Sequence, residues 1–539
     1  MHIVKFIGVI GTSLKFSTFN FQLSIFSFQF KMCIVVRQSI KGAIMNYIGV
    51  LVGFITTFFI VTKYLTTEEV GLTRILVDAS ILLSGLAQLG TSTSAMRYYP
   101  YFKDEKEKDH GFFGWTVILP LFGFLIFSVL FFVFKQPIEN YFSQNSSLFV
   151  DYIYFVIPMS FFMMYLLVFE TNSNLLMRIV VPKFIREVGI RLMTLVAYLL
   201  YAFDVIDLDG MVVALCLTYG FATLFNVIYL FTLKKVSFKI QPSYVTKWLR
   251  KDFIFYTLFL IATSLAGNLI PVLNTFFVSG KLGLAVAGVN TIAVYIASMV
   301  EIPYRSLAAI SRPQISQRLK DNNILGVNEL VQSVSLHQLI ASLFIFFLIW
   351  INIDLIYKLI PNGDIYEAAK FVVFILAIVK IVNTSLNVGT TVLSYSKYYY
   401  YSFLFTVILT FTAIVMNIKL IPIWGMEGAA LASLISYLVY YTALLAFVKW
   451  KLDVTPFSIK ELYILLIITS LFVIDWLLQK YMSGKLMSWF DVEIIGRIVD
   501  SILRTSLMSL SGLVIIYKSK ISKQINDIVD KFLSLLKLI

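Results

Sequence analysis

Long apolar runs are the feature that most limits what this 539-residue chain can fold into. Each run holds about 20 residues with few charges, the length of helix that crosses about 30 Å of hydrocarbon. Helices are the only plausible form in which runs of this length satisfy their backbone polar groups inside lipid. The sequence therefore predicts an all-α polytopic membrane protein with about fourteen transmembrane helices, near residues 41–63, 73–96, 112–134, 152–177, 184–203, 210–232, 253–278, 284–309, 332–353, 366–394, 398–419, 425–448, 460–479 and 494–517.

Composition excludes several other classes of protein. Hydrophobic residues make up 59% of the chain and charged residues only 14%, which is too little polar surface for a soluble globule. The net charge of +14 comes from Lys and Arg spread between apolar runs, so nucleic acid is not a predicted partner. Two distant cysteines and three scattered histidines form neither a disulfide framework nor a metal site, and no cofactor is predicted.

Basic residues gather in every second loop between the runs. If the N-terminus is cytoplasmic, the cytoplasmic loops include the clusters at 97–108, 234–251 and 312–320, and the opposite loops carry few basic residues. Positive loops stay on the cytoplasmic side, so both termini are predicted there. Residues 1–32 have two interpretations, an extension before a true start at Met32 or an arm on the membrane surface. Residues 518–539 are predicted to form an amphipathic basic tail on the cytoplasmic face.

The chain repeats itself at an offset of about 215 residues. The matching segments are 57–63 with 275–281, 170–174 with 383–387, and 209–214 with 424–429. They predict two six-helix lobes, 33–235 and 252–451, joined by a basic cytoplasmic linker at 236–251 and followed by two helices within 452–517. An even number of helices in each lobe makes the copies parallel, and two such lobes around a central cavity are typical of alternating-access transporters.

Three segments within this plan resemble oligosaccharide flippases of the Wzx type: RQSIKGAIMNYIG at 37–49, LTTEEVGLTRILVDA at 65–79 and IPIWGMEGAALASLISYLV at 421–439. The resemblance covers about residues 33–517 and extends to a superfamily that also holds the MATE drug exporters and the lipid II flippases. It implies a bacterial inner-membrane transporter, not an enzyme, that moves an undecaprenyl-pyrophosphate-linked oligosaccharide to the periplasmic leaflet. The product would be O-antigen, capsule or exopolysaccharide. Expected partners are that lipid-linked glycan, membrane lipids, H⁺ or Na⁺, and polysaccharide polymerase machinery.

Polar residues inside the runs are the candidates for a binding site, because a charge at membrane depth costs about 2.5 to 3.5 kcal/mol on insertion scales. Lys380, Asn383 and Asn387 follow one face of the predicted tenth helix. We expect this stripe to meet the pyrophosphate or the sugars, although Lys380 could instead snorkel or pair with a carboxylate on a neighbouring helix. The matching stripe of the first lobe holds Glu170 and Asn174, and Glu170 could form a gate pair with Lys380.

Basic residues near the cytoplasmic ends of two helices are further candidates for cargo contact. Arg186 and Arg191 in the fifth helix, and Lys41 beside the first, lie where a lipid pyrophosphate would enter. The alternative is that they only fix topology.

Carboxylates in the runs have other interpretations. Asp78, the one deeply placed carboxylate of the opening hairpin, could bind a proton or sodium ion, or could accept a hydrogen bond from a serine or threonine on an adjacent helix. Glu301 and Arg305, four residues apart, predict a structural ion pair along the eighth helix.

Two other functions compete with the flippase. A MATE-like exporter of small molecules would carry its key aspartate in the first helix, where this chain has none. A membrane glycan polymerase or glycosyltransferase would commonly present carboxylates or arginines on a sizeable outer loop, and the predicted outer loops are all short. Both differences favour the flippase.

Overall fold

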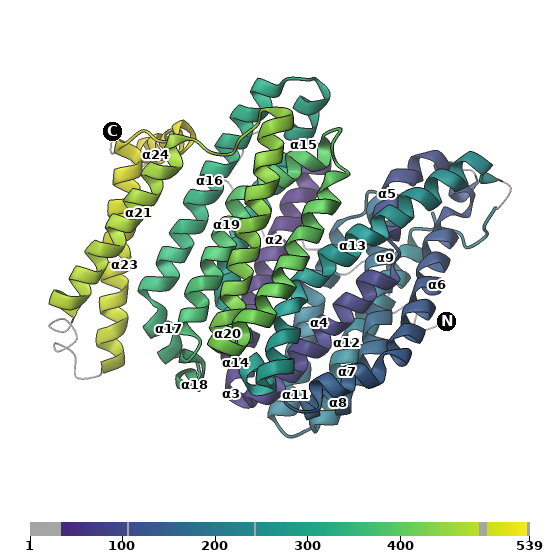
Figure 1. Ribbon diagram of the computed structural model, residues 1–539, viewed down its shortest axis with the longest axis horizontal. Helices are drawn as coiled ribbons and strands as arrows, with labels where there is room; N and C mark the ends of the chain where they lie inside the picture. The colour runs from purple at the N-terminus through teal and green to yellow at the C-terminus, as the bar shows by residue number, and fades with distance from the viewer. Residues whose placement is uncertain (1–33, 105–106, 242–243, 484–492, 536–539) are drawn as a thin grey trace.

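The computed structural model describes residues 34–104, 107–241, 244–483 and 493–535, and every regular element in these ranges is a helix (Figure 1). Eleven of the described helices are long and apolar enough to cross a membrane. The all-α membrane fold is therefore confirmed, whereas the predicted number of fourteen transmembrane helices is not. Residues 1–33, including the proposed start at Met32, lie outside the described residues.

Four of the predicted runs explain the difference between eleven and fourteen. The eleventh and twelfth runs lie in one element, α20 (Tyr401–Leu452), interrupted only at Gly425, where φ is 55° and ψ is −132°. The fifth run is divided among α10 (Val180–Phe184), the π-helical turn η4 (Ile185–Gly189) and α11 (Ile190–Ala202). The seventh run falls within α13 (Lys247–Leu282), where many side chains lie outside the described part.

The elements before residue 235 form a first helical group, in which α4 packs against α6 and α9, and α12 against α9 and α11. Besides α10, η4 and α11, this group consists of α2 (Ile34–Ile55), η1 (Thr56–Val61), α3 (Thr62–Tyr64), α4 (Thr67–Ala87), α5 (Thr91–Phe102), η2 (Lys108–Gly111), α6 (Phe112–Val133), α7 (Lys135–Phe142), α8 (Ser147–Tyr152), η3 (Ile153–Phe155), α9 (Val156–Leu175) and α12 (Leu208–Thr232).

The elements from α13 to α20 form a second helical group, in which α19 packs against α14, α16 and α20. Its other members are α14 (Leu284–Ser298), η6 (Met299–Glu301), α15 (Ile302–Lys320), α16 (Ile324–Ile351), α17 (Ile353–Leu359), α18 (Gly363–Glu367) and α19 (Lys370–Tyr395). Four elements follow, α21 (Ile459–Leu478), η7 (Gln479–Ser483), α23 (Glu493–Lys518) and α24 (Lys523–Leu535). The lobe boundaries inferred from the repeat stay a prediction.

The two groups meet where α4 crosses α14, and glycines make this crossing close. A methyl group on Gly71 would lie 2.1 Å from the carbonyl oxygen of Leu284, and one on Gly288 would lie 1.9 Å from that of Thr67. Small residues of this kind let membrane helices approach at backbone distance. The start of α4 is fixed by a capping box, in which the Thr66 hydroxyl accepts from the amide of Glu69 and the Glu69 carboxylate accepts from the amide of Thr66. The crossing therefore has a defined register.

The layout in Figure 1 runs from α21 and α23 at one edge, through α16, α19 and α20, to α6, α9 and α12 at the other edge. The elements α5, α15 and α24 lie at one end of the molecule, and α3, α8 and α18 lie at the opposite end. The predicted cytoplasmic cluster at 312–320 lies in the last part of α15, and the cluster at 97–108 begins in α5 and continues into the loop after it. We call the end with α5, α15 and α24 the basic end.

Candidate functional site

A chain of alternating charges lies in the first helical group. Arg186 on η4 donates to Glu170 on α9, with 2.9 Å between Nη1 and Oε2, and its Nη2 lies 3.1 Å from Oε1 of Glu187. The second oxygen of Glu187 lies 3.8 Å from Nη2 of Arg191 on α11. The side chains of both arginines are about a third exposed, 39% for Arg186 and 31% for Arg191, and both carboxylates are more deeply buried. The chain is neutral overall, and its cationic groups are the accessible ones.

The backbone around η4 explains how these side chains are positioned. A π-turn interrupts the regular helix here, and single π-turns are frequent at functional sites. Two glycines of α2 then lie directly against the charged chain. A methyl group on Gly49 would lie 2.1 Å from the carbonyl oxygen of Glu187, and one on Gly53 would lie 3.0 Å from Nη1 of Arg191. The helix α2 therefore confines the Arg191 guanidinium on one side.

A second polar network lies in the second helical group and contains the predicted stripe of α19. Nζ of Lys380 lies 3.1 Å from Oε1 of Glu301 on η6, and the Asn383 amide donates to the same oxygen at 3.4 Å. The Tyr441 hydroxyl of α20 donates to Oδ1 of Asn383 at 2.7 Å. The Asn387 amide donates in turn to the Tyr441 hydroxyl at 3.3 Å. All three members of the stripe thus belong to one network that joins α19 to η6 and α20.

The network also reaches α15 and the basic end. The Tyr304 hydroxyl donates to Oδ1 of Asn387 at 2.7 Å, and Arg312 donates to the same hydroxyl at 3.1 Å. In this conformation Lys380 therefore pairs with a carboxylate on a neighbouring element, Glu301, which is one of the two predicted alternatives. The side chains of Lys380 and Glu301 are 26% and 20% exposed, so neither charge is fully enclosed.

Two predicted ion pairs are absent from the described part of the chain. The expected pair of Glu301 with Arg305 is replaced, because Glu301 turns toward Lys380 on α19. The gate pair between Glu170 and Lys380 is also absent, because each of these groups has a nearer partner of opposite charge within its own helical group. Arg305 is exposed and makes no ion pair within the described residues.

For two further predicted binding residues, Asn174 and Lys41, the described structure shows no side-chain partner. Asn174 lies at the end of α9, and its Oδ1 is buried without a hydrogen-bond donor among the described residues. It does not join the charge chain that its neighbour Glu170 joins. Lys41 lies on α2, and its side chain is outside the described part of the structure. The role of both residues stays a prediction.

Asp78 joins the two helical groups. Its side chain on α4 is buried, Nε of Arg74 lies 2.9 Å from Oδ2, and the Thr275 hydroxyl of α13 donates to the same oxygen at 2.7 Å. The carbon of the Arg74 guanidinium lies 5.7 Å from the centre of the Tyr295 ring on α14. The predicted hydrogen bond from an adjacent helix is thus present. Arg74 was not among the predicted site residues, although its spacing from Asp78 is the i, i+4 spacing that predicted a pair between Glu301 and Arg305.

One contact between the groups places like charges near each other. Arg305 of α15 is close enough to Arg191 of α11 for their positive charges to interact, and Tyr295 of α14 also interacts with Arg191. Glu187 partly offsets the charge of Arg191 from 3.8 Å, and Arg305 has no such partner among the described residues. The two arginines thus bring positive charge from both helical groups.

The chain is a polytopic α-helical protein whose fold is similar to that of solved transporters described as MOP superfamily members. The lipid II flippase MurJ, in an inward closed conformation, matches 90% of this chain and 100% of its own length with 15% identity and a TM-score of 0.64. An inward-facing multidrug resistance MATE family transporter of the MOP superfamily matches 78% of this chain and 98% of its own, with 15% identity and a TM-score of 0.59.

A third solved structure with a similar fold is distinguished by the polarity of its binding pocket. It is a MOP superfamily transporter from Pyrococcus furiosus, described as having a binding pocket of reverse polarity that suggests a different function, and it matches 78% of this chain and 95% of its own with 14% identity and a TM-score of 0.54. No protein-family model matches the chain, and no curated protein matches it in sequence. The comparisons therefore show the fold.

Proposed function

We propose that this protein is a flippase that carries an undecaprenyl-pyrophosphate-linked oligosaccharide from the cytoplasmic to the periplasmic leaflet of a bacterial inner membrane. Both termini lie in the cytoplasm in this proposal, and the product enters O-antigen, capsule or exopolysaccharide synthesis through the polymerase machinery. The fold supports a transporter, because the solved structures that share it are a lipid II flippase and MATE transporters. The similarity in fold to MurJ also spans more of this chain than the similarity to the MATE structure.

The observation that carries the proposal is the accessible positive charge on both helical groups: the Arg191 side chain is 31% exposed, and Arg305 is exposed with no ion pair among the described residues. The positive charge of Arg305 acts unfavourably on that of Arg191, and a bound anion would lower this cost. A pyrophosphate has two negatively charged phosphates, and guanidinium groups bind phosphate oxygens in bidentate geometry. The cargo headgroup therefore matches the charge that the protein leaves unbalanced.

The contacts between the helical groups support alternating access. At the end opposite the basic end, the Ser146 hydroxyl donates to the carbonyl of Ser279 at 2.7 Å, and the Asn362 amide donates to the carbonyl of Thr62 at 2.9 Å. These few polar bonds, together with the close crossing of α4 and α14, hold that end together. We propose that rocking of the two groups breaks these bonds and opens the arginine pair to the other side of the membrane.

A MATE-like exporter of small molecules is the second candidate, because MATE transporters share the fold at a TM-score of 0.59. A cationic drug needs an unpaired carboxylate in its site. Among the described groups, Glu170, Glu187 and Glu301 each have a basic partner, and so does Asp78. Arg305, in contrast, has no carboxylate partner among the described residues, which favours an anionic cargo.

Binding of defined lipids to the purified protein tests this proposal. We expect affinity to fall in the order undecaprenyl pyrophosphate, undecaprenyl phosphate, undecaprenol, measured by native mass spectrometry. Each of R191A and R305A should weaken pyrophosphate binding by about 10- to 100-fold, because a hydrogen bond to a charged group contributes about 1.5 to 3 kcal/mol. K449A is the control, since Lys449 is an exposed cation paired with Asp453.

Equal affinity for the pyrophosphate and the alcohol would contradict headgroup recognition. Preferential binding of a cationic dye, lost in E301Q, would favour the exporter instead.

A further inference from the structure

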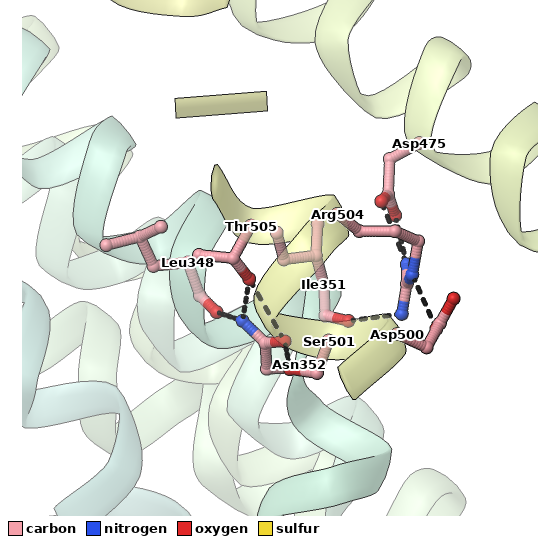
Figure 2. A network of polar contacts seen from close by, with 8 residues as sticks. All are labelled: Leu348, Ile351, Asn352, Asp475, Asp500, Ser501, Arg504 and Thr505. Atoms are coloured by element: carbon pink, nitrogen blue, oxygen red, sulfur yellow. Dashed lines mark hydrogen bonds and ion pairs between the residues drawn. The ribbon is translucent and has the colours of Figure 1, made fainter. Parts of the chain in front are cut away.

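A buried group of charges lies in the two C-terminal helices, outside the predicted repeat (Figure 2). Figure 2 shows the Arg504 guanidinium of α23 between the carboxylates of Asp475 on α21 and Asp500 on α23. Nη1 of Arg504 lies 2.8 and 3.1 Å from the two oxygens of Asp475, and its Nε lies 2.9 Å from Oδ2 of Asp500. One arginine thus forms ion pairs with two aspartates.

The group lies deep in the helices. Arg504 is eleven residues from the start of the 26-residue α23, about 17 Å along a helix of about 39 Å. Asp500 is 1% exposed, Asp475 is 6% exposed, and the Arg504 side chain is 12% exposed. Charges at this depth are expensive unless they are balanced.

Neighbouring polar groups fix the position of Arg504. Its Nη2 donates to the carbonyl oxygen of Ile351, at the end of α16, at 3.3 Å. Next to this contact, the Asn352 amide donates to the Thr505 hydroxyl at 2.9 Å, and the Ser501 hydroxyl donates to Oδ1 of Asn352 (Figure 2). The guanidinium is therefore held against α16 and cannot turn to serve further oxygens.

The charges in this group do not balance. With both carboxylates ionised, the group carries one net negative charge in a buried place. Both oxygens of Asp475 and one oxygen of Asp500 face Arg504, whereas Oδ1 of Asp500 is buried with no hydrogen-bond donor among the described residues. An ionised oxygen left in this state has a high desolvation cost, and a neutral carboxyl has a much smaller one.

We propose that the buried carboxylates of Asp475 and Asp500 share one proton, so that the α21–α23 pair carries a proton-binding site. The proton comes from the aqueous phase and converts the group from a net charge of −1 to neutrality. Oδ1 of Asp500 is the oxygen that the geometry leaves open to it. The proposal does not depend on the cargo proposed above.

The other groups around Asp500 leave no better source of charge. Among the described residues, Arg504 on its own helix and Asp475 on α21 are the charged groups of this network, and α16 contributes the carbonyl of Ile351 and the Asn352 amide. On α17, Asp354 pairs with Lys370 instead. A metal cation needs several oxygen ligands, whereas a proton needs one, and Oδ1 of Asp500 is a single open oxygen in a part of the structure where the described residues form no metal-ligating cluster. The site therefore takes a proton.

Infrared difference spectroscopy of the full-length protein at neutral pH tests the proposal. We expect the wild type to show the carbonyl stretch of a protonated carboxyl that shifts in heavy water. D500N should lose this band because it removes the carboxyl, and D475N should lose it because the remaining Asp500–Arg504 pair is neutral without a proton. D354N, which changes an exposed aspartate on α17, should keep it.

Loss of the band in D475N distinguishes a shared proton from an acid elsewhere in the protein, and it keeps the test valid if D500N does not fold. Persistence of the band in D475N, or its absence from the wild type, would overturn the proposal. Thermal stabilisation of the wild type by sodium at constant ionic strength, absent in D500N, would also overturn it in favour of a metal cation.

Discussion

The ion pair between Lys380 and Glu301 gives a sharp quantitative prediction. Replacing Lys380 by Met leaves the Glu301 carboxylate with one contact among the described residues, the 3.4 Å hydrogen bond from Asn383. Removing one partner of a fully buried pair costs about 3 to 5 kcal/mol, and an exposed pair contributes about 0.2 to 1 kcal/mol. The two side chains are 26% and 20% exposed, so we expect K380M to lower the free energy of unfolding by about 1 to 3 kcal/mol.

A double-mutant cycle isolates the pair. E301Q in the K380M background removes the unpaired charge, so the double variant should recover part of the loss, with a coupling energy of about 1 to 2 kcal/mol. The assay is unfolding in mixed detergent micelles. Asp354 and Lys370 provide a matched control near the start of α19, where the more exposed pair should couple by less than about 1 kcal/mol. Additive effects of K380M and E301Q would refute the electrostatic account of this network.

Three further variants test the packing. G288A should lower the free energy of unfolding by about 1 to 3 kcal/mol, because its methyl group would lie 1.9 Å from the Thr67 carbonyl oxygen. G189A is the control and should be neutral or stabilising, because the nearest atom to its methyl group would be 3.9 Å away. Equal effects of the two variants would contradict the close crossing of α4 and α14. G425A should cost about 1 to 3 kcal/mol because of the positive φ, and a neutral result would show that α20 has no such break. T275V should lower the free energy of unfolding by about 1 to 3 kcal/mol, because it removes a hydrogen-bond donor to the buried Asp78 carboxylate. T291V should lower it less, because the Thr291 hydroxyl donates to a carbonyl of its own helix. The reverse order would argue against the contact between α13 and α4.

The sequence predicts the fold class because hydrocarbon imposes a simple rule on backbone hydrogen bonds. Apolar runs of the required length can only be helices, and this holds whatever the exact boundaries of each run. The number of helices is harder to predict, because it depends on local geometry. The break at Gly425 separates two predicted runs without ending the element, and the π-turn at 185–189 divides a single run. Neither feature changes the hydropathy of its run.

The polar site is only partly predictable for a related reason. Spacing along one helix placed Lys380, Asn383 and Asn387 on a common face, and the structure joins them in one network. The spacing of residues along one helix does not show which other helix packs against it. Glu301 was therefore predicted to pair with Arg305 on its own helix, whereas it pairs with Lys380 on α19. Arg504 was missed although Asp500 lies four residues before it on the same helix, and its second partner, Asp475, reaches it only because α21 packs on α23.

The direct test of the flippase proposal is the sidedness of lipid-linked glycans in the host after deletion of this gene. We expect undecaprenyl-pyrophosphate oligosaccharide to accumulate in the cytoplasmic leaflet while surface polysaccharide is lost. Complementation with the wild type should reverse both changes, and complementation with the R191A/R305A double variant should not. Unchanged glycans in the deletion strain, together with new sensitivity to cationic drugs, would contradict the proposal and favour an exporter.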